Sequence, residues 1–208
     1  MAITTFSELK TAIADTLNRS DLTSTIPNFI VMCEAKCNRI LRTRDQRTRS
    51  TSVSIASEYT AVPSGFREAV KFKITTSSPT TPLTYITPEE MDIKAAERSD
   101  ANGLPIWYTI EGGYLRVNPS PDTTYTAELV YYASLTALSD SNTSNWLLSK
   151  HPDAYLYGSL VHSAPYLKDD ERIAIWAGLF DAIISDINLE DQRSSAAARI
   201  AVRGRAIG

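Results

Sequence analysis

The sequence predicts an α+β fold in which helices from both ends of the chain form a bundle and a β-rich segment is inserted between them. Apolar residues recur every three or four positions near both ends, whereas they alternate with polar residues in much of the middle. Ser, Thr and Pro also gather in the middle, where strands and turns favour them. We therefore expect a helical hairpin over 1–47, a β-rich domain with a short helix over 48–138, helices over 139–192 that complete the bundle, and a basic tail over 193–208.

The N-terminal segment has the pattern of two short-linked helices. Thr5 and Glu8 have the spacing of a capping box, and an apolar stripe runs from Phe6 to Leu17. Pro27 suits the first turn of the second helix, where its missing N–H is not needed. The helical pattern is expected to last until about residue 45.

From about residue 48 the apolar period changes to two, which predicts strands. Val70, Phe72 and Ile74 alternate with lysines and indicate a strand with one wet face, and Gly112-Gly113 is a strong hairpin signal. We expect strands at 51–55, 70–74, 106–110, 114–117 and 125–132, a loop at 75–81 and a helix at 87–98.

The C-terminal third is expected to be helical again. A helix begins at Pro152 and is kinked or ended near Pro165. The longest helix runs from about Asp169 to about Ser195, and acidic residues in its first turn complement the helix dipole. The remaining segment is rich in arginine and ends in a sequence that forms helices poorly.

Composition excludes several classes of protein. With 208 residues and 43% hydrophobic content the chain can bury a core, and it has no run of the roughly 20 apolar residues that a membrane span needs. The first residues lack the basic region of a signal peptide, so we expect synthesis in a cytoplasm and no membrane partner. A net charge of −3 argues against a general electrostatic grip on nucleic acid.

The residues that carry most enzyme chemistry are scarce. His151 and His162 are the only histidines, and we expect a helix cap and a partly exposed helix residue rather than a metal pair. Cys33 and Cys37 fall on an apolar stripe, which favours core packing. No glycine-rich phosphate loop is present. We therefore predict no catalytic, cofactor or metal site, and no enzyme.

Arginine is the one residue type whose distribution suggests a binding surface. One series lies near the second helix and another in the C-terminal segment, and each either complements a helix C-terminus or meets an acidic partner or DNA phosphate. The candidate interface residues are Arg39, Arg42, Arg44, Arg47, Arg49, Arg193, Arg199, Arg203 and Arg205.

Two stretches near the ends of the chain resemble the head–tail adaptor (connector, or head-completion) proteins of tailed bacteriophages. The N-terminal stretch includes Ile26-Pro27-Asn28-Phe29-Ile30 and Asn38-Arg39-Ile40-Leu41-Arg42. The C-terminal stretch includes residues 151–158 and 164–172 and then Trp176. They cover a little under half of the chain and enclose the β-rich part.

The resemblance implies a structural virion protein at the head–tail interface of a phage or a gene-transfer particle. Such a protein would form a ring, commonly a dodecamer, beneath the portal protein, extend the channel for DNA ejection, and dock a downstream tail protein during tail assembly. Because each subunit carries −3, a ring of about twelve would carry about −36, so DNA would pass without specific binding. The alternative is a DNA-binding or tail-associated module that uses the Arg39–Arg49 face.

Overall fold

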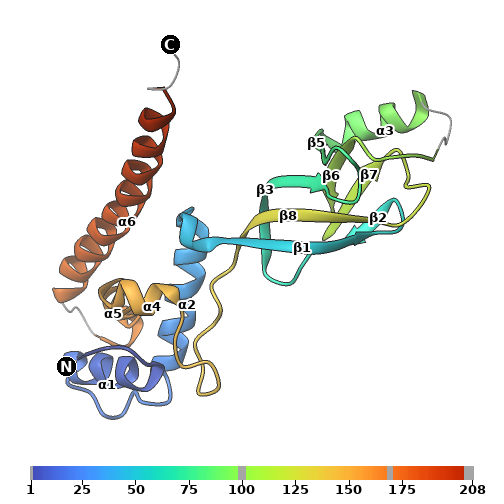
Figure 1. Ribbon diagram of the computed structural model, residues 1–208. Helices are drawn as coiled ribbons and strands as arrows, with labels where there is room; N and C mark the ends of the chain where they lie inside the picture. Colours follow the sequence, from blue (N-terminus) through green and yellow to red (C-terminus); the bar gives the residue numbers. More distant parts are fainter. Residues whose placement is uncertain (1, 98–101, 168–170, 204–208) are drawn as a thin grey trace. The chain divides into compact units, whose positions relative to one another are not determined.

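The computed structural model describes residues 2–97, 102–167 and 171–203, with only the backbone of 194–203, and divides the chain into two compact units (Figure 1). The helical unit combines Met1–Gln46 with Leu135–Gly208, and the β unit comprises Arg47–Ser134. Six α-helices and two sheets in the described residues confirm the mixed α+β class.

The first two helices of the helical unit begin where their sequence signals predict. Helix α1 spans Phe6–Leu17, and its expected capping box is confirmed by hydrogen bonds in both directions between Thr5 and Glu8. Helix α2 spans Ile26–Ile40 with Pro27 in its first turn.

The expectation that α2 reaches about residue 45 is wrong. The Arg42 guanidinium donates hydrogen bonds to the carbonyls of Asn38 (3.1 Å) and Leu41 (2.6 Å), and Leu41 is already extended. The side chain thereby satisfies backbone acceptors that the helix end leaves unpaired. A short 3-10 helix, η1, follows at Arg44–Gln46.

The C-terminal part of the helical unit begins with two short helices separated by His151. Helix α4 spans Trp146–Lys150 and is capped by Asn145, and α5 spans Pro152–Val161. The 3-10 helix η2 follows at Ala164–Tyr166, so Pro165 lies after the end of α5, as expected.

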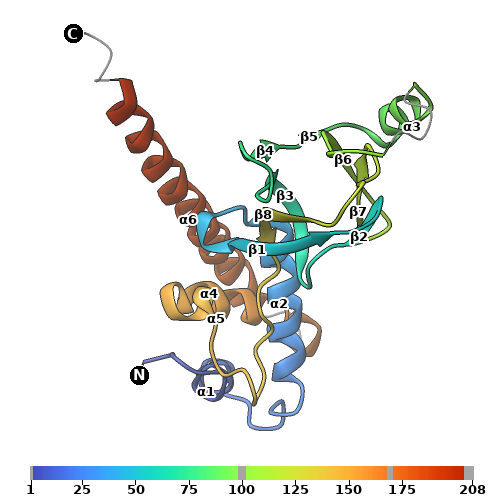
Figure 2. The same cartoon turned by 45° about the vertical axis from the view of Figure 1, so that its right-hand side comes forward.

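Helix α6 spans Arg172–Arg203 and extends beyond α4 and α5 (Figures 1 and 2). The expected start at Asp169 lies outside the described residues. The expected end near Ser195 is wrong, because the backbone stays helical to Arg203, so that the first part of the basic segment from Arg193 belongs to this helix. Three consecutive alanines after Ser195 favour this continuation, because alanine has the highest helix propensity.

The β unit contains two four-stranded sheets. One has the order β1-β8-β3-β4 and the other the order β2-β7-β6-β5. The strands are β1 Arg47–Ile55, β2 Tyr59–Ala61, β3 Phe66–Ile74, β4 Thr81–Pro82, β5 Thr84–Tyr85, β6 Trp107–Glu111, β7 Tyr114–Asn118 and β8 Tyr125–Ala133. Helix α3, Pro88–Glu97, lies against β6 and β7.

Turn chemistry sets the register of the hairpin between β6 and β7. Gly112 and Gly113 both have positive φ (54° and 85°), which allows Glu111 to pair directly with Tyr114. The expected alternation in β3 is only partly correct. Phe72 and Ile74 are buried, but Val70 is exposed because the register with β8 shifts between Ala69 and Lys71.

Each unit has its own hydrophobic core. The helical core joins α1, α2, α4, α5 and α6, whereas the β core lies between the two sheets and includes Phe72, Tyr108 and Leu129. Leu135 and Leu138 lie in the segment expected to be β-rich, yet their amides donate to Asn38 (2.8 Å) and Glu34 (2.9 Å) of α2. These two hydrogen bonds place the segment that follows β8 in the helical unit.

No helix among the described residues is both long and apolar enough to cross a membrane.

Candidate interaction surfaces

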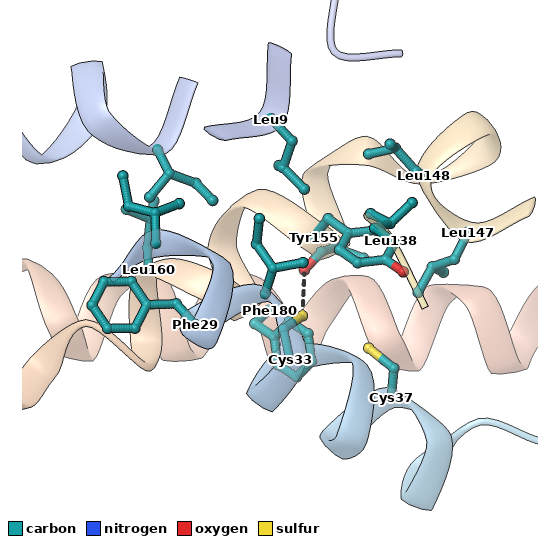
Figure 3. Packing of buried hydrophobic residues seen from close by; sticks show 14 of the residues in the cluster. Leu9, Phe29, Cys33, Cys37, Leu138, Leu147, Leu148, Tyr155, Leu160 and Phe180 are labelled. Atoms are coloured by element: carbon teal, nitrogen blue, oxygen red, sulfur yellow. Dashed lines mark hydrogen bonds between the residues drawn. The ribbon is translucent and has the colours of Figure 1, made fainter. Parts of the chain in front are cut away.

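The interior of the helical unit positions its surfaces, and its tightest point is Gly158 on α5. A Cβ atom at this position would lie 2.7 Å from Cε2 of Phe180 on α6 and would overlap Sγ of Cys33 on α2. Figure 3 shows Cys33 and Phe180 meeting in the core near Tyr155. Three helices therefore come together where α5 has no side chain.

A buried carboxylate ties α2 to α5. Oε1 of Glu34, whose residue is 4% exposed, accepts hydrogen bonds from the Tyr155 hydroxyl (3.0 Å) and the Leu138 amide. Asn145 donates to the Tyr155 oxygen (2.6 Å) and to the Thr136 carbonyl (2.9 Å). Burial raises the pKa of Glu34, although its two hydrogen bonds oppose the shift. This network fixes the chain between the β unit and α4.

The two cysteines are core residues, as expected. Both thiols are free and buried, and Cys33 donates a long hydrogen bond to the Ala154 carbonyl (Sγ–O 3.7 Å; Figure 3). The neighbouring Cys37 and burial both raise the pKa of Cys33, so this thiol stays protonated and unreactive.

The two histidines lie at opposite ends of α5. His151 is the boundary residue between α4 and α5, and His162 follows the last residue of α5. Burial lowers the pKa of His162, and the nearby charges of Lys36 and Arg39 lower it further. Within the described ranges, no group of three or more His, Cys, Asp or Glu residues is placed to hold a metal ion.

The arginine series near α2 is divided between the two units. Arg39 is exposed on α2, and Arg42 and Arg44 follow it in the helical unit, whereas Arg47 and Arg49 lie on β1 of the β unit. Helix α2 ends at Ile40, so the helix-end placement fits Arg39 and Arg42, which bonds to the last carbonyls, but not Arg47 and Arg49 on β1.

Besides Arg42, three more of these arginines have partners within the chain. Arg44 pairs with Asp191 of α6 (3.0 Å), Arg47 donates to the Tyr132 hydroxyl (2.9 Å), and Arg49 pairs with Glu128. Much of the positive charge of the series is therefore already engaged in ion pairs or hydrogen bonds.

The C-terminal arginine series begins on α6. Arg193 is exposed on α6, and Arg199 and Arg203 lie on the helical backbone. The side chains of Arg199 and Arg203, and the whole of Arg205, lie outside the described part of the chain.

A charged pocket of about 400 Å³ lies beside α6 in the helical unit. Its lining includes the Arg44–Asp191 pair and the Lys150–Asp45 pair (2.5 Å), together with His151. The charges in these two pairs balance each other, and Glu190 is the one further acid of the lining. Paired charges of this kind are typical of a structural ion-pair network rather than a site for a charged ligand.

A second, apolar pocket of about 360 Å³ lies between α2 and η2. We call it the α2 groove. Val31 and Met32 on its rim are 56% and 51% exposed, and Nε2 of His162 is buried there without a hydrogen-bond partner. The groove is lined by Asn28, Phe29, Val31, Met32, His162, Pro165 and Tyr166.

Helix α6 carries a further exposed apolar surface on the side opposite its core face. Ile175 is 61% exposed, and Leu179 and Leu189 are also exposed, whereas Trp176, Phe180 and other core-facing residues are buried. We call Ile175, Leu179, Ala182 and Leu189 the α6 stripe. A helix that is apolar on two sides has one side available for a partner.

The sequence pattern did not lead us to the groove or the stripe, although exposed apolar residues on both helices pointed to them. Val31 and Met32 fall off the periodic stripe of α2, as Ile175 and Leu179 fall off that of α6. Apolar residues outside the core-facing positions of an amphipathic helix indicate a second contact surface.

Comparison with known proteins identifies the family. No curated protein matches the chain. One family, described as SU10 adaptor protein, matches residues 4–203, so that the match includes both units. The chain belongs to this family, which is a family of bacteriophage head–tail adaptors.

Proposed function

We propose that this protein is a ring-forming adaptor that lies beneath the portal, extends the DNA channel and docks tail proteins. Membership of a phage adaptor family supports a structural role in the virion and an association with portal and tail proteins in general. The single observation that favours a ring is the presence of two exposed apolar surfaces, the α2 groove and the α6 stripe, on one small unit.

We also propose a division of labour between the units. The helical unit is the bundle that assembles the ring, and the β unit, inserted between its two parts, carries contacts to the next tail protein. The helical part that begins at Arg193 reaches towards the portal. The exposed apolar residues Tyr59, Tyr85, Ile93 and Tyr114 support a contact role for the β unit.

The proposed work of the ring is non-covalent. Neighbouring subunits bury apolar surface, and closure of the ring makes each modest contact depend on all the others. The net charge of −3 on each subunit favours a channel wall that DNA does not adhere to. A lining that proved strongly basic would contradict this part of the proposal.

The test is the mass of the purified protein, measured by analytical ultracentrifugation alone and after mixing with a purified portal ring. We expect a closed ring, either free or bound to the portal, with about twelve copies. A chain that stays monomeric in both samples would contradict the proposal.

A gel-shift titration over a range of salt concentrations tests the alternative of DNA binding by the Arg39–Arg49 face. We expect weak binding, because these arginines are divided between two units and four of them already have partners within the chain. Tight binding by the monomer that weakens steeply with salt would favour the alternative.

A further inference from the structure

Helix α6 cannot fill the α2 groove of its own chain with its stripe. Phe180 of α6 lies beside Cys33 of α2 in the core, and the next residue, Asp181, approaches Lys36 of α2 to 3.6 Å, so this side of α6 faces α2. Because an α-helix turns about 100° per residue, Ala182 and Leu179 point roughly 100° and 200° away from Asp181. The stripe therefore faces away from its own α2, and both surfaces are open to another molecule.

The two surfaces also carry opposite charge. Between Arg172 and Arg193, α6 contains no Lys or Arg, and Asp186 is exposed within the stripe, about one turn from both Ala182 and Leu189. On α2 the only acidic residue is Glu34, which is buried, whereas Arg39 is exposed. Arg39 and Lys36 lie close enough to His162 of the groove to lower its pKa.

The shapes of the two surfaces are complementary as well. The groove is an apolar depression with Val31 and Met32 at its rim, and the stripe presents the branched side chains of Ile175, Leu179 and Leu189 along a helix of 32 residues. An amphipathic helix commonly binds by laying apolar side chains at helical spacing into such a groove. Ile175 and Leu179, four residues apart, have that spacing.

We infer that the α2 groove of one copy receives the α6 stripe of a neighbouring copy, with Arg39 of the first facing Asp186 of the second. The inference rests on the proposed ring and names its subunit contact. Because groove and stripe are different surfaces, each copy offers one to each neighbour, and a constant rotation between copies closes the series into a ring.

Intermolecular disulfide formation in the full-length protein tests this contact. Val31→Cys and Leu179→Cys are made in separate chains, which are mixed in equal amounts and oxidised. We expect a disulfide-linked dimer in the mixture and little in either variant alone, since the contact joins a groove to a stripe. The native thiols of Cys33 and Cys37 are buried and do not compete. Thr11→Cys, at an exposed position of α1, replaces Leu179→Cys in the matched control and should give no dimer.

Charge exchange tests the polar part of the contact. Arg39→Glu and Asp186→Arg should each weaken self-association about tenfold, and the two changes in one chain should restore it to within about threefold of the wild type. Restoration requires that the two charges meet between copies. If each substitution instead weakened association by destabilising the fold, the two losses would add in the double variant.

The outcomes separate this inference from the proposed function. If the wild type forms rings but the mixed cysteine variants do not cross-link, the ring stands and this contact is wrong. If Leu179→Cys cross-links efficiently with itself, the contact joins two stripes and the inference is also wrong. A wild type that stays monomeric even with the portal overturns both.

Discussion

The two units stabilise their buried polar groups in opposite ways. The helical unit places a carboxylate inside its core, where Glu34 is bonded to Tyr155 and to a backbone amide. The β unit also buries a carboxylate, that of Glu128, but pairs it with the cations of Arg49 and Lys73, and its other ion pairs lie nearer the surface. Arg116 pairs there with Glu58 (2.7 Å) and Asp92 (2.6 Å), which are partly or largely exposed.

This difference indicates where each unit tolerates change. A few interior contacts fix the helix arrangement, and water cannot replace them. The β unit distributes its stability over strand pairing and ion pairs that solvent reaches. When such an ion pair is lost, water can hydrogen-bond to the charged group that remains. We therefore expect the largest effects of substitution in the helical core. Hydrogen exchange read by mass spectrometry can assign each effect to one unit.

The largest effect is expected at Gly158. Gly158→Ala should lower the free energy of unfolding by about 3 kcal/mol, because the new methyl group overlaps Cys33 and Phe180 in a core that cannot expand cheaply. Urea unfolding measures the loss. Gly178→Ala on α6 is the matched control, since nothing lies within 4 Å of its added Cβ, and it should stabilise by up to about 1 kcal/mol. Equal losses at both positions would show that the three-helix contact is not tight.

The next effect concerns Glu34. Glu34→Ala should cost about 2 kcal/mol, because the Tyr155 hydroxyl and the Leu138 amide lose their shared acceptor. Glu34→Gln keeps an acceptor oxygen and should cost much less at neutral pH.

The same residue predicts a pH dependence. Burial raises the pKa of Glu34 in the folded state, so its contribution to stability is present at low pH and is lost as the pH rises through that raised pKa. Between about pH 4 and pH 7 the wild type should therefore lose stability relative to Glu34→Gln. Urea unfolding of both proteins over this range measures the difference. A wild type that gains stability relative to the variant would contradict the direction of the shift.

A smaller effect is expected in the β unit, at the turn between β6 and β7. Gly113→Ala should cost about 1 kcal/mol, because its φ of 85° is unfavourable for a residue with a Cβ. Gly103→Ala, which adds a Cβ in open space where φ is not positive, is the control and should be nearly neutral. Hydrogen exchange should show faster exchange in β6 and β7 alone, and protection that changes equally in the helical unit would contradict the division into separate cores.

The smallest effect is expected at Arg116. Burial opposes its charge, but hydrogen bonds to Asp92 and Glu58 outweigh burial and raise the pKa of Arg116. Arg116→Lys keeps the charge and loses the fork geometry, so unfolding should become easier by about 0.5 kcal/mol at low salt and by less at high salt. A loss that does not change with salt would show that packing against Tyr59, rather than charge, holds the residue.

Local signals in the sequence were sufficient for many of the elements. The capping box at Thr5 and Glu8, Pro27 in the first turn of α2, and the hairpin at Gly112 and Gly113 each depend on backbone chemistry within a few residues. Such interactions are readable without the rest of the fold. The resemblance to head–tail adaptors also came from the sequence, and the family match confirms it.

Distant contacts decided the features that the sequence did not reveal. Val70 is exposed because of a register shift against β8, and the chain at Leu135 and Leu138 belongs to the helical unit because its amides bond to Asn38 and Glu34 of α2. The sequence determined the α+β class and the family of this protein. Only the tertiary structure decided that Glu34 is buried, that Gly158 leaves room for two other helices, and that a groove and a stripe remain open. Each of these features depends on residues that are far apart along the chain and meet only after folding.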